Sequence, residues 1–83
     1  MTLTRDEVLA KVREHLATEL ELDEDEIVDG TRIREDLDAT SLDLYELVME
    51  LEDTYGVSVS EEEAAKIETI AHVVDFVVEH QPA

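Results

Sequence analysis

Residues 41–55 carry apolar side chains at helical spacing on two opposite faces, and this pattern restricts the chain to a fold of packed helices. Leu42, Tyr45 and Met49 lie on one face among acidic residues. An exposed apolar stripe bordered by charge is typical of a protein interaction site. The alternative is that Tyr45 and Met49 pack beneath a neighbouring loop. The opposite stripe is wide enough to face a core by itself, and it contains Leu44, Leu47, Val48, Leu51 and Tyr55.

Helix start and stop signals divide the rest of the chain into further helices. A serine or threonine suited to cap a helix stands at positions 4, 40, 60 and 69, and Gly56 is suited to end the second helix. The predicted helices span about residues 4–19, 41–55, 61–67 and 69–80. We therefore expect one all-α domain over residues 1–83, a four-helix bundle with a short third helix and a long loop between the first and second helices.

The segment from Leu20 to Thr40 has no helical period. Its isolated apolar residues Ile27, Ile33 and Leu37 can hold this loop on the core. A long loop without regular structure in a compact domain is often functional. The loop also contains Asp25, Asp29, Gly30 and Asp36 in an EF-hand-like frame, but the third position is isoleucine and the twelfth is aspartate instead of glutamate. We expect no dedicated metal site.

The charge of the chain limits its partners. Among its 83 residues are 24 acidic and 6 basic side chains, a formal net charge of -18. Binding to nucleic acid requires Lys and Arg to neutralise phosphates, so nucleic acid is not expected as a partner. Between Arg34 and Lys66 lie eleven acidic residues and no basic one, which favours partners with basic surface patches. The alternative is that the acidic residues serve solubility alone.

The N-terminal sequence, the length of the apolar runs and the cysteine content indicate where the chain is located and what chemistry it can perform. The N-terminal residues lack the basic and then apolar order of a signal peptide, and no apolar run reaches membrane-spanning length. We expect a monomer in the cytoplasm without membrane insertion. The chain has no cysteine, so any thiol chemistry requires an added group.

Ser41 stands where the acidic loop gives way to the second predicted helix. It can satisfy a backbone N–H, act as a hydrolytic nucleophile, or accept a covalent modification. A hydrolase needs a base and an oxyanion site; His15, His72 and His80 are available, but the chain has no Gly-x-Ser-x-Gly elbow. A phosphodiester on the hydroxyl would lie at the positive end of the helix dipole. We therefore interpret Ser41 as an attachment point.

The residues around Ser41 also form a recognisable motif. The stretch Glu35-Asp36-Leu37-Asp38-Ala39-Thr40-Ser41-Leu42-Asp43-Leu44-Tyr45-Glu46-Leu47-Val48-Met49 resembles the prosthetic-group region of acyl carrier proteins. In that family the pattern is glutamate-aspartate-leucine-glycine-x-aspartate-serine-leucine, then aspartate, then glutamate-leucine-valine-methionine. The similarity continues through residues 61–70 and ends at His80-Gln81, so it covers nearly the whole chain.

The resemblance implies a function and a set of sites. It implies a single acyl carrier domain, not an enzyme, in which Ser41 carries 4′-phosphopantetheine and the arm's thiol holds acyl groups as thioesters. The pathway would be of type II, in the first place fatty-acid biosynthesis. A phosphopantetheinyl transferase and acyl-processing enzymes with basic docking patches would bind at Leu42, Asp43, Tyr45, Glu46, Met49, Glu52 and Asp53. The acyl cavity would be lined by Leu44, Leu47, Val48, Leu51, Ile67 and Val73.

Two residues depart from the family pattern. Asp38 replaces the usual glycine, which tolerates left-handed backbone better than aspartate does. Thr40 replaces the usual aspartate, which keeps capping ability and removes a charge. These departures leave open a specialised polyketide or aminoacyl carrier. An acidic helical adaptor that only binds basic partners is the alternative of another class, and it would not require Ser41.

Overall fold

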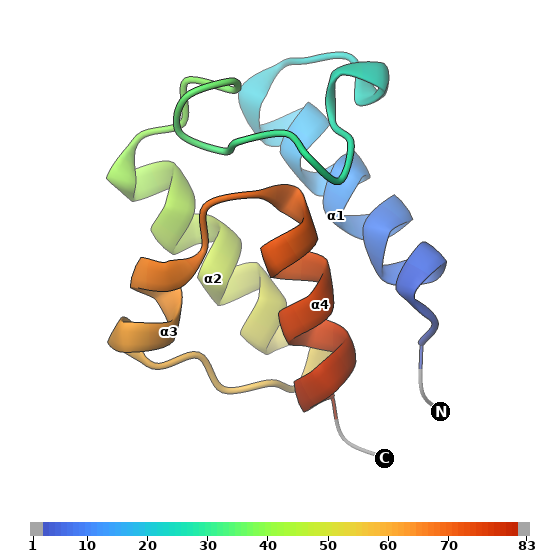
Figure 1. Ribbon diagram of the computed structural model, residues 1–83, viewed down its shortest axis with the longest axis vertical. Helices are drawn as coiled ribbons and strands as arrows, with labels where there is room; N and C mark the ends of the chain where they lie inside the picture. Colours follow the sequence, from blue (N-terminus) through green and yellow to red (C-terminus); the bar gives the residue numbers. More distant parts are fainter. Residues whose placement is uncertain (1–2, 82–83) are drawn as a thin grey trace.

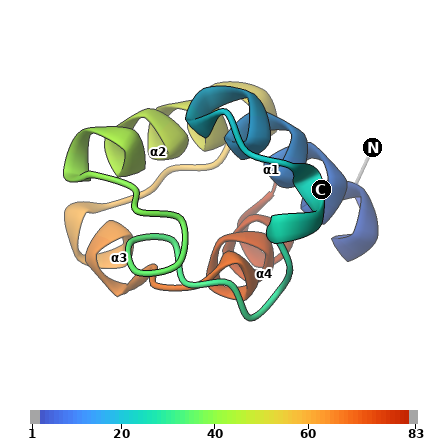
Figure 2. The same ribbon diagram turned by 90° about the horizontal axis from the view of Figure 1, so that it is seen from above.

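The computed structural model describes residues 3–81, and within them it contains α-helices and no β-strand (Figure 1). The elements are α1 (Arg5–Leu20), the 3-10 turn η1 (Glu24–Glu26), α2 (Ser41–Tyr55), α3 (Glu61–Lys66) and α4 (Ile70–His80). Seen from above, α1 and α2 lie on one side of the molecule and α3 and α4 on the other (Figure 2). The all-α prediction with a short third helix is confirmed; the ends of the predicted domain lie outside the described residues.

Local hydrogen bonds explain where the helices begin. At α2, the Asp43 N–H donates to the Thr40 hydroxyl at 3.2 Å and the Thr40 N–H donates to the Asp43 carboxylate at 2.9 Å. The same reciprocal arrangement starts α1 at Thr4, α3 at Ser60 and α4 at Thr69. Each box satisfies N–H groups that have no partner inside the helix, so these starts are properties of local sequence.

The helix ends differ slightly from the prediction. Gly56 ends α2 in the left-handed region at φ 68°, as expected from its position. α1 ends one residue later than predicted, because Glu21 adopts the same region at φ 56° and donates its N–H to the Ala17 carbonyl. This conformation is uncommon for a residue with a side chain. α3 ends at Lys66, one residue before the predicted Ile67.

The loop between α1 and α2 is held on the core as predicted. Ile27, Ile33 and Leu37 are buried. The Ile33 N–H donates to the Glu68 carbonyl at 2.9 Å, and the Ile70 N–H donates to the Thr31 carbonyl at 3.0 Å. The loop therefore crosses one end of the bundle and is tied to the start of α4 (Figure 1).

The core is mainly aliphatic and comes from every long helix. α1 contributes Val8, Val12 and Leu16, and it packs beside α4. The fully buried residues of α4 are Ile70, Val73, Val74 and Val77. α2 buries the predicted stripe of Leu44, Leu47, Val48, Leu51 and Tyr55. Among the described residues, no helix is both long and apolar enough to span a membrane.

Candidate functional site

Ser41 is the first residue of α2, and its side chain is exposed. The capping hydrogen bonds belong to Thr40 and Asp43, so the hydroxyl of Ser41 is not needed to begin the helix. The alternative in which Ser41 serves only to satisfy a backbone N–H at the helix start is therefore wrong. An exposed hydroxyl at the N-terminus of a helix of 15 residues is accessible to a modifying enzyme, and the helix dipole favours a negative group there.

The two departures from the family pattern lie just before α2. Asp38 adopts the left-handed conformation at φ 56°, where glycine is the favoured residue. Thr40 keeps an extended backbone and the capping role predicted for it. The Arg32 guanidinium and backbone N–H hold the carboxylate of Asp36, which turns the chain just before Asp38. Hydrogen bonds within the loop thus fix the path of the backbone that leads to Ser41.

A cavity of about 230 Å³ opens beside Ser41, between α2 and α3. Its wall is mainly apolar on the α2 side, where Leu44, Tyr45 and Val48 line it. The remaining lining residues are Ser41, Arg34 from the loop, and Glu61, Ala64 and Ala65 from α3. A hydroxyl at the edge of a largely apolar cavity is a suitable place to attach a group that carries an apolar cargo.

The sequence-based prediction of the cavity lining is only partly correct. Leu44 and Val48 line this cavity, but Leu47 and Leu51 line a different one and Val73 lies in the closed core. The prediction missed Arg34 and the residues of α3. The small adjacent side chains Ala64 and Ala65 are the signal that was available, because small residues let two helices leave space between them.

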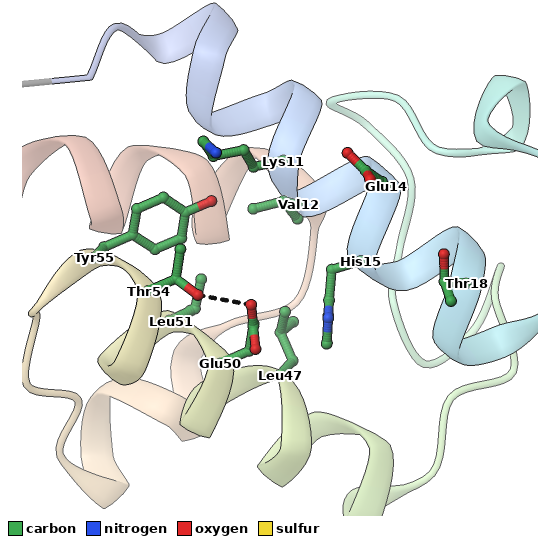
Figure 3. Close-up of a pocket in the computed structure, with 10 residues that line it drawn as sticks. All are labelled: Lys11, Val12, Glu14, His15, Thr18, Leu47, Glu50, Leu51, Thr54 and Tyr55. Carbon is green, nitrogen blue, oxygen red and sulfur yellow. Dashed lines mark hydrogen bonds between the residues drawn. The ribbon is translucent and has the colours of Figure 1, made fainter.

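The second cavity, of about 320 Å³, lies between α1 and α2 (Figure 3). Leu47 and Leu51 form its floor, and Glu50 accepts a hydrogen bond from Thr54 at 2.6 Å at its edge. His15 lines it from α1 and is half-buried, with its Nε2 atom shielded from solvent and without a partner among the described residues. His15 therefore faces α2 across this cavity, far from the cavity beside Ser41.

The second apolar face of α2 is exposed. Leu42, Tyr45 and Met49 expose 66%, 62% and 61% of their surface, whereas Leu47 and Leu51 on the opposite face expose 1% and 0%. The alternative that Tyr45 and Met49 pack beneath the loop is wrong. Tyr45 also lines the cavity beside Ser41, so the exposed stripe and the cavity share a side chain.

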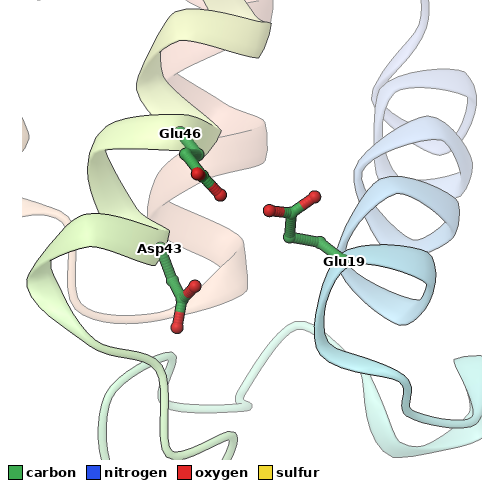
Figure 4. A group of neighbouring side chains, drawn as sticks. All are labelled: Glu19, Asp43 and Glu46. Atoms are coloured by element: carbon green, nitrogen blue, oxygen red, sulfur yellow. The ribbon is translucent and has the colours of Figure 1, made fainter.

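Acidic side chains border this stripe. Glu46 points toward Glu19 of α1, and the carboxylate of Asp43 lies nearby at the start of α2 (Figure 4). Carboxylate oxygens of these residues lie within 4.8 Å of one another, and such exposed groups often converge without an ion. Glu52 accepts a hydrogen bond from the Val59 N–H at 3.1 Å, and Asp53 is exposed. The contribution of Glu19 was missed because it is far from α2 in the sequence.

The cluster makes the stability of the fold depend on pH. The pKa of Glu46 is raised, first by a hydrogen bond with the Glu19 carboxyl, then by repulsion from the Glu19 charge. The folded protein therefore binds this proton more readily than the unfolded chain, and acidification through the raised pKa stabilises the fold. The pKa of Asp36 is lowered by the Arg32 backbone and side chain, so its contribution is lost as the pH falls through its folded pKa, below the ordinary 3.8.

We therefore expect the melting temperature to rise as the pH falls from neutral toward the ordinary glutamate pKa of 4.5, because Glu46 is protonated first in the folded state. It should fall again below the ordinary aspartate pKa of 3.8, where the contribution of Asp36 is lost. Glu46→Gln should flatten the rise at mild acidity, and Glu24→Gln, an exposed acid on η1, should not. Melting curves by circular dichroism across this range would check both statements. A rise that is equally steep in Glu46→Gln would place its origin outside the cluster.

Comparison with known proteins places this geometry in a family. Residues 10–77 match the family model described as a phosphopantetheine attachment site. The chain is 49% identical to an acyl carrier protein of Rubrobacter xylanophilus over 81 residues, which cover 98% of this chain and 100% of that protein. It is 35% identical to an acyl carrier protein of Lactobacillus acidophilus, over 95% of this chain and 99% of that one.

Solved structures agree with the sequence relatives. An acyl carrier protein from Enterococcus faecalis superposes with a TM-score of 0.83 at 39% identity, covering 95% of this chain and 100% of that one. An acyl carrier protein from Thermotoga maritima gives a TM-score of 0.78 at 26% identity, over 92% of this chain and 88% of that one. The matched region contains the capped start of α2, the cavity and the exposed stripe. The chain therefore belongs to the acyl carrier proteins, the family that carries acyl groups on a covalently attached 4′-phosphopantetheine arm.

Proposed function

We propose that Ser41 is the attachment point of the arm, and that residues 1–83 act as one acyl carrier domain of a type II pathway, in the first place fatty-acid biosynthesis. The observation that carries the proposal is the exposed Ser41 hydroxyl at the start of a capped helix, beside a largely apolar cavity. When bound, the group supplies the thiol that the chain lacks and holds acyl cargo as a thioester. The residues of the chain position the attachment and shelter the cargo.

The environment of Ser41 fits this group. The N-terminus of α2 offers backbone N–H groups and a positive dipole end to a phosphodiester. Leu44, Val48 and Ala64 offer an apolar surface to the acyl chain. Departures at Asp38 and Thr40 keep open a specialised polyketide or aminoacyl carrier, which would differ in cargo and not in the attachment chemistry.

We also propose that the domain is not itself an enzyme. Among residues 3–81, no histidine lines the cavity beside Ser41. His72 accepts hydrogen bonds from the Thr69 and Glu68 N–H groups, and His80 is bonded to the Phe76 carbonyl at 2.9 Å. None of these rings is placed to act as a base on Ser41, which supports a tether and argues against a hydrolase. We further propose that the domain works as a monomer in the cytoplasm.

The deciding experiment is the enzymatic loading of the purified chain. Incubation with a phosphopantetheinyl transferase, coenzyme A and Mg²⁺ should add one phosphopantetheine per chain, measured by intact mass spectrometry. The same measurement on protein isolated from its own source would show the cargo and so separate fatty-acid, polyketide and aminoacyl roles. No gain of mass with two unrelated transferases would overturn the carrier proposal and favour the acidic adaptor.

We also propose that partner enzymes dock on the exposed stripe through basic patches. The apolar side chains of Leu42, Tyr45 and Met49 would enter the partner's contact surface, and Asp43, Glu46, Glu52 and Asp53 would meet its basic residues. The exposure of the stripe and its acidic border support this arrangement. Aromatic and methionine side chains are enriched at such interfaces.

Variants on α2 test the docking surface. Met49→Ala should weaken binding to a basic partner enzyme by on the order of 1–2 kcal/mol, the range for loss of a central apolar anchor. Glu46→Lys should mainly slow association and reduce its salt dependence. Glu46→Lys should leave the fold intact, because it replaces a repulsive contact with Glu19.

Equilibrium titrations would measure the affinity of each variant for the partner, and stopped-flow experiments at two salt concentrations would measure the association rate. Glu24→Lys makes the same charge change away from the stripe and should have a smaller effect.

A further inference from the structure

Arg34 is the basic residue that lines the cavity beside Ser41. The other arginines of the chain are engaged. Arg5 pairs with Asp29 at 3.0 Å and Asp75 at 2.9 Å, and Arg32 pairs with Asp36 at 3.1 Å. Arg13 donates to the Ile27 carbonyl at 2.9 Å. Arg34 has no carboxylate within ion-pair distance in residues 3–81.

The charges near Ser41 make this position unusual. Asp38 and Asp43 lie within a few residues of the attachment hydroxyl, and the net charge of the chain is -18. A phosphodiester on Ser41 would add a further negative charge to this surface. A guanidinium is matched to phosphate oxygens, because its planar N–H groups can donate two parallel hydrogen bonds. The cavity thus brings together a hydroxyl that receives a phosphate and an unpaired side chain suited to hold one.

We propose that Arg34 is a positioning residue for the prosthetic arm, pairing with the phosphodiester attached to Ser41 and directing the arm's first segment along the α2–α3 cavity. The inference rests on the proposed attachment at Ser41. Beyond the phosphodiester, the wall formed by Leu44, Tyr45 and Val48 is apolar, so an arm held at its base by Arg34 delivers its cargo to that wall.

Glu61 provides the competing arrangement. It lines the same cavity from α3, and an ion pair between Arg34 and Glu61 would close the cavity mouth in the unmodified protein. The pairing of Arg34 with the phosphodiester and its pairing with Glu61 differ in the state of the protein in which the Arg34 side chain becomes ordered. Pairing with the phosphodiester requires the arm, whereas pairing with Glu61 does not.

The test compares unmodified and phosphopantetheine-loaded full-length protein by NMR. In the native sequence, loading should shift the Arg34 side-chain Nε–H resonance and slow its exchange with solvent. The pair between Arg34 and the phosphodiester is exposed, so we expect the paired state to outnumber the unpaired state by about two- to fivefold. The phosphorus resonance of the loaded protein should move with added NaCl, because salt screens an exposed pair.

Three variants complete the design. Loaded Arg34→Gln should give a phosphorus resonance that no longer responds to NaCl beyond the response of free phosphopantetheine, and Arg34→Lys should restore part of the response, since it keeps the charge and loses the planar fork. Lys66→Gln removes the same charge from an exposed side chain outside this cavity and should behave as the native protein. Melting curves of each variant confirm that the fold is retained.

The outcomes separate the inference from the function on which it rests. If the transferase adds nothing to the native protein, the attachment at Ser41 and the role of Arg34 both fail. If the group is added but the Arg34 resonance stays unchanged and Arg34→Gln matches the native phosphorus signal, the role of Arg34 alone is overturned. It is also overturned if the Arg34 resonance is already protected before loading and Glu61→Gln removes that protection.

Discussion

Ser41→Ala is expected to abolish loading by the transferase completely, because the alanine side chain has no oxygen to form the phosphodiester. The variant should fold normally, since Thr40 and Asp43 provide the hydrogen bonds that begin α2. Intact mass spectrometry after incubation with transferase, coenzyme A and Mg²⁺ would show an unchanged mass for the variant and one added group for the native chain.

Ser58→Ala is the matched control for this experiment. Ser58 is an exposed serine in the link between α2 and α3, outside any helix, so it offers the same chemical group without the helix start or the cavity. The control should load as the native chain does. A full gain of mass in Ser41→Ala would place the attachment elsewhere and remove the basis for the role of Arg34.

Leu47→Ala is expected to have the largest effect on stability among the α2 variants. Leu47 is 1% exposed, and removal of a buried leucine side chain typically costs about 2–5 kcal/mol. A domain of this size has a total stability of about 4–12 kcal/mol, so this loss is a large part of the whole. Met49→Ala, on the exposed face, should change stability by less than about 0.5 kcal/mol.

Urea titrations of the two variants would measure this difference directly, and the pair is matched because both remove a large aliphatic side chain from the same helix. Leu47→Ala should impair partner binding only to the extent that the protein is unfolded. Met49→Ala should impair binding in a protein that is fully folded. Equal destabilisation by both variants would show that Met49 belongs to the core and that partners dock elsewhere.

The capped helix starts and the end of α2 could be predicted from the sequence because the interactions that set them are local. The capping boxes join residues three positions apart, and Gly56 ends α2 through its own backbone conformation. The periodic stripe of α2 also predicted which side chains are buried, since a helix places every third or fourth residue on one face. The motif around Ser41 predicted the family, and the comparisons confirm it.

The tertiary structure alone decided which residues meet across elements. Leu44 and Leu47 belong to one stripe, yet they face separate cavities, because α3 covers one flank of α2 and α1 covers the other. Glu19 meets Glu46 because the end of α1 lies beside the start of α2, which no local pattern encodes (Figure 4). Arg34 reaches the cavity of Ser41 because the loop is tied to the start of α4. Helical periodicity specifies the direction of each side chain from its own axis, whereas its neighbours depend on how loop length, burial and long-range hydrogen bonds place the axes.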